Sequence, residues 1–211
     1  MHLISINIAS GSQLKIGSRL TRTGIDKSAA SSAEVGLLGL HGDLVANQKH
    51  HGGPDQAVYV YSAEDYAWWS AQLGRELRPG TFGENLTLSA FGPEPVRIGD
   101  RYAIGAIALE VTAPRIPCST LAAHVGERDF IERFRIAERP GFYARVLTPG
   151  DVRVGDPVSV EPRSSGATLI ELYRLWYKTA PAADELASAL AAPIAVRMRA
   201  RYEKLRADLT A

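Results

Sequence analysis

Cys118 is the side chain best suited to chemistry in this sequence. It ends the segment Pro114-Arg115-Ile116-Pro117-Cys118, in which two prolines stiffen the chain before the thiol. A helix is expected to begin directly after it, at Ser119 or Thr120. A helix N-terminus and a nearby guanidinium both favour the thiolate, which is a nucleophile and a soft metal ligand. The alternative is an inert cysteine that only packs in the core.

A second candidate segment is His50-His51-Gly52-Gly53-Pro54-Asp55. Gly52 and Gly53 allow backbone N–H groups to approach a ligand closely. His51 is able to transfer a proton or to bind a metal. The alternative is a structural loop, since no second histidine or carboxylate stands at the spacing typical of a zinc site.

Two more segments carry polar groups close to a glycine. Asn85 follows Phe82-Gly83-Glu84 and offers an amide that could contact the edge of a heterocycle, or it caps a turn. Arg22, Thr23 and Lys27 surround Gly24. Such a group could hold an anion, and the alternative is an exposed loop.

Composition restricts the class of protein. The 211 residues include 24 Lys+Arg and 23 Asp+Glu, a net charge of +1, which argues against a general nucleic-acid binder. The single cysteine excludes an internal disulfide and fits a reducing compartment. The N-terminus lacks the basic region of a signal peptide, and no apolar run reaches the length of a membrane span. We therefore expect a cytoplasmic protein that does not enter membranes.

Short strands are expected to position these groups. Alternating or β-branched residues predict strands at 3–8, 13–16, 57–61, 85–88 and 104–111. Segments 96–100 and 152–156 both read apolar-Arg-apolar-Gly-Asp, which predicts a strand, a tight turn and a returning strand. Helices are expected from Ser62 to Leu73, burying Trp68, Trp69 and Leu73, and over 127–136, with Phe130, Ile131 and Phe134 on one side.

The last fifth of the chain has a different pattern. Thr168 and Glu171 form a capping box that opens a helix to about Lys178, and Pro181 and Pro193 open two more. We expect a strand-rich domain over 1–162 and a three-helix domain over 168–211. The apolar positions expected in the last helix are Ile194, Met198, Tyr202, Leu205 and Leu209. The basic ones are Arg197, Arg199, Arg201, Lys204 and Arg206, either a solvated face or a docking surface.

Taken together and in this order, the motifs resemble the MOSC domain, the C-terminal domain type of molybdenum cofactor sulfurases. The matching segments are Thr23-Gly24-Ile25, 51–55, Phe82-Gly83-Glu84-Asn85-Leu86, Gly99-Asp100 and 114–118. The stand-alone bacterial YiiM-type members also carry a small C-terminal helical unit. The resemblance implies an α+β fold, with a β-barrel like that of pyruvate kinase and peripheral helices.

The same resemblance implies a cofactor and a chemistry. MOSC domains bind the molybdopterin form of the molybdenum cofactor, and members that catalyse reduce N-hydroxylated compounds such as hydroxylaminopurines. Cys118 would be the thiolate ligand of molybdenum, and His51 would help to protonate the substrate. The cofactor would contact Arg115, Thr23, Asn85 and the Gly52-Gly53 backbone. Many relatives carry a basic residue where this chain reads Ala30-Ser31-Ser32-Ala33-Glu34, so Arg22 or Lys27 would hold the phosphate here.

A reductase of this kind needs an electron donor. One cysteine cannot hold an iron–sulfur cluster, and the sequence has no dinucleotide-binding fingerprint, so the electrons would come from a partner reductase protein. The basic last helix is a candidate surface for an acidic donor. The alternative function is a carrier of the cofactor or of its sulfur, in which Cys118 holds a persulfide.

Overall fold

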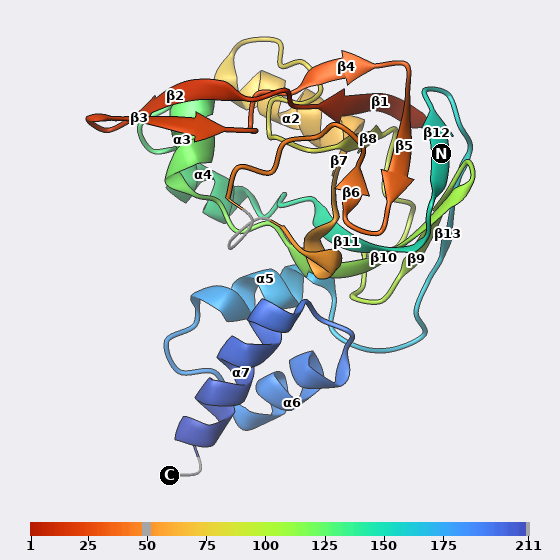
Figure 1. The fold of residues 1–211 in the computed structure, drawn as a ribbon. Coiled ribbons are helices and arrows are strands. Elements are labelled where there is room, and N and C mark those ends of the chain that lie inside the picture. The colour runs from red at the N-terminus through yellow and green to blue at the C-terminus, as the bar shows by residue number, and fades with distance from the viewer. Residues whose placement is uncertain (48–51, 210–211) are drawn as a thin grey trace.

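The computed structural model describes residues 1–47 and 52–209 as a curled sheet with helices around it and three helices gathered at the C-terminal end (Figure 1). The strands are β1 Leu3–Ile8, β2 Ser12–Ile16, β3 Arg19–Thr23, β4 Ser28–Ala30, β5 Ser32–Gly36, β6 Gly39–Leu40, β7 Val58–Ser62, β8 Leu86–Leu88, β9 Arg101–Ile104, β10 Ile107–Pro114, β11 Phe142–Thr148, β12 Gly150–Arg153 and β13 Val158–Glu161. The helices are η1 Pro54–Gln56 (a 3-10 turn), α2 Ala63–Leu73, α3 Ser119–Val125, α4 Phe130–Ala137, α5 Leu169–Tyr177, α6 Ala183–Ala191 and α7 Val196–Asp208. The predicted strand-rich α+β fold is confirmed.

The largest sheet has eight strands in the order β13-β9-β10-β11-β7-β8-β1-β4. Every neighbouring pair is antiparallel except β7 and β8, which run parallel and are connected through α2. The sheet curls until β1 meets the start of β13: Leu3 N–H donates to the Asp156 carbonyl at 2.9 Å, and Gly155 N–H donates to the Leu3 carbonyl at 2.8 Å. These bonds give the sheet a barrel-like curvature, although no continuous ladder joins the two strands in the described part of the chain.

One expected strand is divided by a turn. The apolar run from Ile104 to Val111 was expected to be a single strand, and this is wrong. Ile104 ends β9, Gly105 turns with φ +55°, and Ile107 begins β10. A Cβ atom at Gly105 would lie 2.2 Å from a carboxylate oxygen of Asp156, so the turn requires a glycine. The other four expected strands are confirmed as β1, β2, β7 and β8.

The two similar segments at 96–100 and 152–156 form the same turn. The Asp100 carboxylate accepts a hydrogen bond from Arg97 N–H at 2.7 Å, and the Asp156 carboxylate accepts one from Arg153 N–H at 2.8 Å. Each aspartate thereby satisfies the backbone three residues earlier, as short polar side chains do in turns. The second turn lies between β12 and β13, as predicted. β9 follows the first turn, but the strand expected before it is wrong, because only an isolated bridge at Arg97 is present there.

Helix α2 covers one face of the sheet and has the predicted ends. Ser62 Oγ accepts from Asp65 N–H at 3.1 Å, and Gly74 closes the helix with φ +63°. The buried stripe differs in part from the prediction: Trp69 is buried together with Tyr66, whereas Trp68 and Leu73 are only partly buried and pack against the core. The helix turns Tyr66 toward the sheet because it lies three positions before Trp69.

Aromatic rings fill the space between α2, α4 and the sheet. Trp69 stacks on Phe134 with ring centroids 5.8 Å apart, and Phe82 stacks on Phe130 at 6.1 Å. Helix α4 begins three residues later than expected, at Phe130, and Ile131 is 41% exposed, so its expected burial is wrong.

The three C-terminal helices are confirmed. The capping box of α5 is complete, because Glu171 N–H donates to Thr168 Oγ at 3.1 Å and Thr168 N–H donates to the Glu171 carboxylate at 2.8 Å. In α7, Met198 and Tyr202 are buried, whereas Leu209 is 52% exposed, so the apolar stripe ends earlier than predicted.

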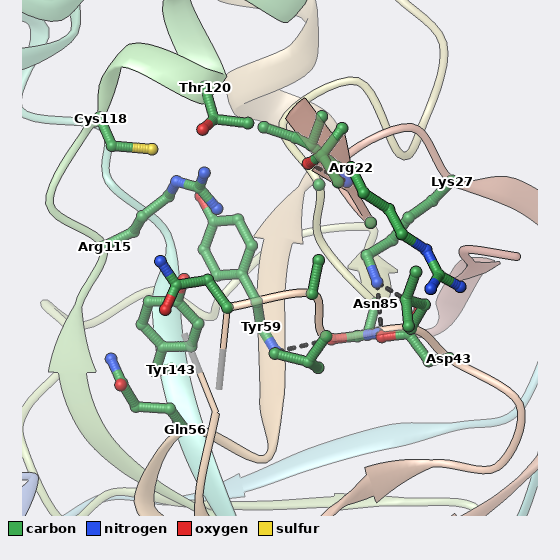
Figure 2. Close-up of a pocket in the computed structure, with 18 of the residues that line it drawn as sticks. Arg22, Lys27, Asp43, Gln56, Tyr59, Asn85, Arg115, Cys118, Thr120 and Tyr143 are labelled. Atoms are coloured by element: carbon green, nitrogen blue, oxygen red, sulfur yellow. Dashed lines mark hydrogen bonds and ion pairs between the residues drawn. The ribbon is translucent and has the colours of Figure 1, made fainter. Parts of the chain in front are cut away.

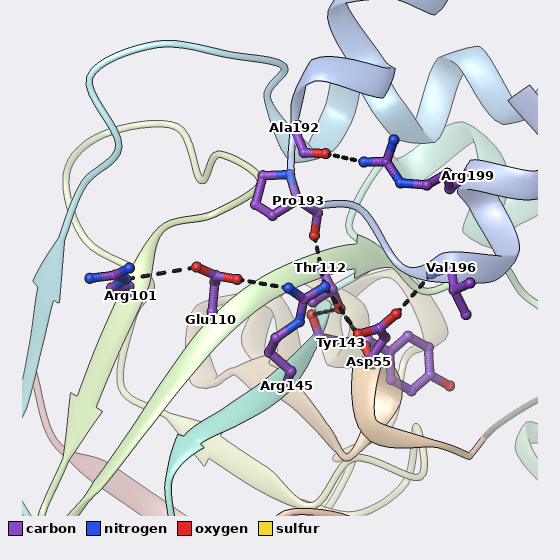
Figure 3. A network of polar contacts seen from close by, with 10 residues as sticks. All are labelled: Asp55, Arg101, Glu110, Thr112, Tyr143, Arg145, Ala192, Pro193, Val196 and Arg199. Atoms are coloured by element: carbon purple, nitrogen blue, oxygen red, sulfur yellow. Dashed lines mark hydrogen bonds and ion pairs between the residues drawn. The ribbon is translucent and has the colours of Figure 1, made fainter. Parts of the chain in front are cut away.

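These helices rest on the sheet through both apolar and polar contacts. Buried Leu169 and Leu172 of α5 belong to the same apolar core as the strands. A polar network joins β10, β11 and η1 to the start of α7 (Figure 3). The division into domains at 1–162 and 168–211 stays a prediction. In the described ranges, no helix has the length and apolar character needed to cross a membrane.

Glu84 is a fully buried carboxyl beside the sheet. One of its oxygens, Oε1, accepts from Gly80 N–H at 2.6 Å, Tyr66 Oη at 2.7 Å and Thr87 Oγ1 at 2.8 Å, and Oε2 has no partner among the described residues. Burial raises the pKa of Glu84 above its usual value, and these hydrogen bonds offset only part of the effect.

This raised pKa predicts a specific dependence of stability on pH. The folded state holds the Glu84 proton more tightly than the unfolded chain, so stability is fullest below the unfolded pKa and falls as pH rises toward the folded pKa. Glu84→Gln cannot ionise, so its stability does not fall in this way. Each tenfold difference in proton affinity between the folded and unfolded states costs the wild type about 1.4 kcal/mol of stability at high pH. Urea unfolding between pH 4.5 and 8 should show the variant gaining stability relative to the wild type. Parallel pH profiles would contradict the prediction.

Candidate functional site

One pocket collects most of the side chains that the sequence singles out (Figure 2). The cavity has a volume of about 150 Å³ and lies between the end of β3, the loop after β6, strands β7 and β11, and the loop from β10 into α3. Six of the nine candidate residues line it, namely Arg22, Thr23, Lys27, Asn85, Arg115 and Cys118.

The thiol of Cys118 enters the pocket from the loop after β10. Cys118 is the N-cap residue of α3 and is half-buried, and its carbonyl accepts from Ala122 N–H at 3.2 Å. Figure 2 shows its sulfur on the same side of the pocket as Thr120 and the Arg115 guanidinium. The expectation that a helix starts directly after the thiol is therefore confirmed.

Arg115 lies under this loop and is only 5% exposed. Its guanidinium carbon lies 4.9 Å from the centre of the Tyr59 ring, a cation–π contact. Burial lowers the pKa of Arg115, but Tyr143, Tyr59 and Cys118 raise it by more, so the group stays cationic. Cys118 is thus one of the groups that interact electrostatically with the Arg115 guanidinium.

Two tyrosine rings form the floor of the pocket. Tyr59 of β7 pairs in register with Tyr143 of β11, and their ring centroids lie 5.0 Å apart. Tyr59 Oη donates to the Pro140 carbonyl at 2.8 Å, which fixes the first ring from its far end. Burial raises the pKa of both tyrosines, so both hydroxyls remain protonated at neutral pH. The floor is a rigid, uncharged aromatic surface.

A polar cluster around Asp43 forms the opposite wall. Lys27 Nζ lies 2.5 Å from each Asp43 carboxylate oxygen, and Asn85 Nδ2 donates to the same carboxylate at 2.8 Å. Asn85 Oδ1 accepts from Tyr59 N–H at 3.1 Å. Burial lowers the pKa of Lys27, and the attraction of Asp43 counters part of that shift. Lys27 and Asn85 are therefore already bonded to other groups of the protein, and these bonds fix the position of this wall of the pocket.

Thr23 and Arg22 differ in exposure although they are neighbours in β3. Thr23 is buried, and its hydroxyl accepts from Ile25 N–H at 3.1 Å, which shapes the turn after the strand. Arg22 is exposed and lines the mouth of the pocket. Arg22 therefore offers an accessible positive charge to an anionic ligand, whereas the Thr23 hydroxyl is neutral and already has a backbone partner.

The glycines of the second motif lie outside the pocket lining. Gly53 precedes η1 with φ +95°, and its carbonyl accepts from Gln56 N–H at 3.0 Å. Asp55 bonds to α7 instead of facing the pocket, because its carboxylate accepts from Val196 N–H at 2.8 Å. His51 lies outside the described residues.

Several pocket residues were not predicted from the sequence as functional, among them Asp43, Gln56, Tyr59 and Tyr143. Asp43, Tyr59 and Tyr143 are each separated by many residues from the side chains that they contact. Tyr59 is recognisable only as part of a strand, and Tyr143 reaches it because β7 pairs with β11. No local spacing in the sequence reveals these contacts.

The pocket residues fit an anionic ligand that carries a metal able to bind a thiol: the cationic side chains match its charge, and the Cys118 sulfur could bind the metal. Among the described lining residues, three cationic side chains, Arg22, Lys27 and Arg115, stand against the single carboxylate of Asp43, so this part of the lining is cationic. Arg115 Nε is buried without a hydrogen-bond partner in the described part of the protein. A buried guanidinium normally completes its hydrogen bonds, so this atom indicates that a ligand acceptor belongs beside it. Among the described residues, no group of three His, Cys, Asp or Glu side chains is placed to hold a metal ion.

Comparison with known proteins identifies the family of the chain. The model of the MOSC domain matches residues 47–159. "Uncharacterized protein YflK" of Bacillus subtilis is 37% identical over 154 residues, covering 72% of this chain and 70% of that protein. A protein named "Reductase" from Gibberella moniliformis is 35% identical over 129 residues, which are 59% of this chain and 23% of that protein.

The fold of the whole chain also has a solved counterpart. The crystal structure of YiiM from Geobacillus stearothermophilus superposes with a TM-score of 0.78 at 29% identity, covering 97% of this chain and 98% of that one. The likeness therefore includes the C-terminal helices as well as the strands. The chain belongs to the MOSC domain family and resembles its stand-alone YiiM-like members.

Proposed function

We propose that the pocket binds the molybdopterin form of the molybdenum cofactor, and that the protein reduces N-hydroxylated compounds such as hydroxylaminopurines to amines. One observation carries the proposal: a thiol lies beside a buried arginine whose Nε has no partner among the described residues. Membership of the MOSC family supports the cofactor, and the relative named "Reductase" supports the reaction class.

Each pocket residue has a role in this proposal. Cys118 would bind the metal through its thiolate sulfur, and Arg115 would donate to an anionic part of the cofactor. Arg22 would hold the phosphate at the mouth, because its charge is accessible whereas that of Lys27 is matched by Asp43. Thr23 and Asn85 would contribute by shaping the walls. A contact between the Gly52-Gly53 backbone and the cofactor stays a prediction.

The reaction requires electrons, protons and a bound substrate. The N–O bond of the substrate breaks and takes up two electrons and two protons, which gives an amine N–H and water. When bound, the cofactor supplies a redox centre that exchanges two electrons. The chain itself supplies the cavity, the aromatic floor of Tyr59 and Tyr143, and the fixed charge of Arg115. His51 stays the predicted proton source.

Turnover tests the reductase against the alternative carrier function. The purified holoprotein would be given chemically reduced viologen as the electron source and a hydroxylaminopurine as the substrate, with amine formation measured. The proposal predicts amine formation that depends on bound molybdenum. Molybdenum without turnover would favour a carrier of the cofactor or its sulfur, and it would contradict the reductase.

The electron donor would be a partner protein with an acidic surface, and α7 is the proposed docking surface. Two of its basic residues are occupied in the fold: Arg199 donates to the carbonyls of Leu190 and Ala192, and Arg201 stacks on Trp176 at 4.6 Å. The docking proposal therefore rests on exposed Lys204 and Arg206.

Charge reversal should weaken the use of the donor. We expect Lys204→Glu with Arg206→Glu to raise the KM for the physiological donor about tenfold at low salt, and less at high salt because ions screen the attraction. Turnover with viologen should stay unchanged. Lys15→Glu with Arg19→Glu, on the exposed β2–β3 hairpin, is the matched control. If the α7 double variant and the hairpin double variant raise the KM for the donor equally, α7 is not the docking surface.

A further inference from the structure

Glu84 is a buried carboxyl that the proposed cofactor contacts do not use, although it lies directly behind the pocket. Its neighbours in the chain, Gly83 and Asn85, both line the pocket. Glu84 itself has no exposed surface, and its Oε2 has no hydrogen-bond partner among the described residues. A buried, ionised oxygen without a donor is unfavourable, whereas a protonated carboxyl carries no charge. The surroundings of Oε2 therefore favour the neutral acid.

The titratable side chains packed directly against Glu84 are tyrosines. Its Oε1 accepts from the Tyr66 hydroxyl of α2 at 2.7 Å. Tyr59 and Tyr61 of β7 interact with Glu84 electrostatically, and burial raises the pKa of all three tyrosines. They stay neutral at neutral pH, so none of them balances the charge of an ionised Glu84.

Two cations of the pocket also interact with Glu84. Burial lowers the pKa of Lys27, and Asp43 and Glu84 are among the groups that counter this shift. Burial likewise acts to lower the pKa of Arg115, and Glu84 and Cys118 are among the groups that raise it. Figure 2 shows the two cations on opposite sides of the pocket. Lys27 is already paired with Asp43 at 2.5 Å, so an ionised Glu84 would chiefly offset the charge of Arg115.

An anionic ligand beside Arg115 would therefore compete with an ionised Glu84. Charges interact strongly over several ångströms in a buried site, because little water is present to screen them. An ionised Glu84 offsets part of the attraction of Arg115 and also repels the ligand. A protonated Glu84 leaves the full positive charge of Arg115 to the ligand.

We propose that Glu84 is a further functional residue of the pocket, which must carry a proton for the pocket to hold its anionic ligand tightly. When Glu84 is ionised beforehand, binding of the anion takes up one proton from solvent, and loss of that proton weakens binding by the same factor. The affinity should thus fall as pH rises through the pKa of Glu84. The inference rests on the proposed cofactor binding and adds a proton-coupled control of its affinity.

Cofactor retention at two pH values tests this role. Wild type and Glu84→Gln, which stays neutral at every pH, would be produced in a host that makes the cofactor. Molybdenum and pterin per chain are then measured after stepwise dilution and gel filtration at pH 6 and pH 8.5. We expect equal retention at pH 6. At pH 8.5 the dissociation constant of the wild type should be about tenfold higher than that of Glu84→Gln, as expected for repulsion between buried charges.

Two further variants show whether the effect belongs to the Glu84 proton. Glu110→Gln removes a carboxylate outside the pocket that pairs with Arg145, and it should follow the wild type at both pH values. Tyr66→Phe keeps the Glu84 carboxyl but removes a donor that favours its ionised form. The pKa of Glu84 should then rise, and the loss of cofactor should move to higher pH. The melting temperature of each variant shows that it is folded.

The outcomes separate this inference from the proposed function. If the wild type carries neither molybdenum nor pterin at either pH, the proposed cofactor binding fails and the inference fails with it. If the wild type carries the cofactor and Glu84→Gln responds to pH in the same way, the role of the Glu84 proton is overturned. If folded Glu84→Gln retains less cofactor than the wild type at both pH values, Glu84 acts through the shape of the pocket, which also overturns the inference.

Discussion

Cys118→Ala is expected to lose molybdenum and turnover together while the protein stays folded. The thiol is half-buried and lies on the same side of the pocket as the Arg115 guanidinium, with whose charge it interacts. Losing the protein ligand should weaken metal retention by about a hundredfold or more, since even neighbours of metal ligands change affinity by ten- to a hundredfold. The measurements are molybdenum and pterin per chain after gel filtration, with amine formation on the same samples.

The adjacent residue provides a control for this experiment. Ser119 is the first residue of α3, is exposed and does not line the pocket, so Ser119→Ala changes the same helix end without removing the thiol. We expect this variant to keep the cofactor and the activity. Full molybdenum content in Cys118→Ala would show that the thiolate is not a ligand.

Arg115→Met is expected to weaken cofactor binding by about ten- to a hundredfold, because hydrogen bonds to a charged group contribute more than neutral ones. The guanidinium is buried and stacked on Tyr59, and its Nε has no partner among the described residues. Arg115→Lys should not restore binding, since an ammonium cannot offer the same planar set of donors. Cofactor content at increasing dilution measures the change in affinity.

Arg139, a second arginine that stacks on an aromatic ring, serves as a control that distinguishes an effect on cofactor binding from an effect on stability. Arg139 lies 4.8 Å from the centre of the Trp68 ring and pairs with Asp65 outside the pocket. Arg139→Met should lower the melting temperature by an amount comparable to Arg115→Met and leave the cofactor content unchanged. If both variants lose cofactor in proportion to stability, Arg115 acts only through the fold.

The fold was largely predictable because its signals are local. The serine cap of α2, the capping box of α5 and the two Gly-Asp turns each involve residues three positions apart, and all are present. Errors arose where tertiary packing chose between apolar neighbours. Tyr66 is buried more fully than Trp68, and Ile131 is left exposed on α4, because the position of each helix against the sheet decides which face is covered.

The site was predictable only in part for the same reason. Cys118 and Arg115 are close in sequence, and both line the pocket. The contacts of Lys27 and Asn85 with Asp43 span 16 and 42 positions, and the pairing of Tyr59 with Tyr143 depends on β7 meeting β11. Sequence spacing cannot encode such contacts. Asp55, at the end of the second candidate segment, bonds to the start of α7, a contact that spans 141 positions.

The central claim, that this pocket holds the molybdenum cofactor, is tested most directly by the cofactor content of the wild-type protein. The chain would be produced in parallel in a host that makes the cofactor and in one that cannot, and molybdenum and pterin would be measured per folded chain. The account predicts about one molybdenum and about one pterin per chain from the competent host, and neither from the other. Folded protein from the competent host with neither component would contradict it.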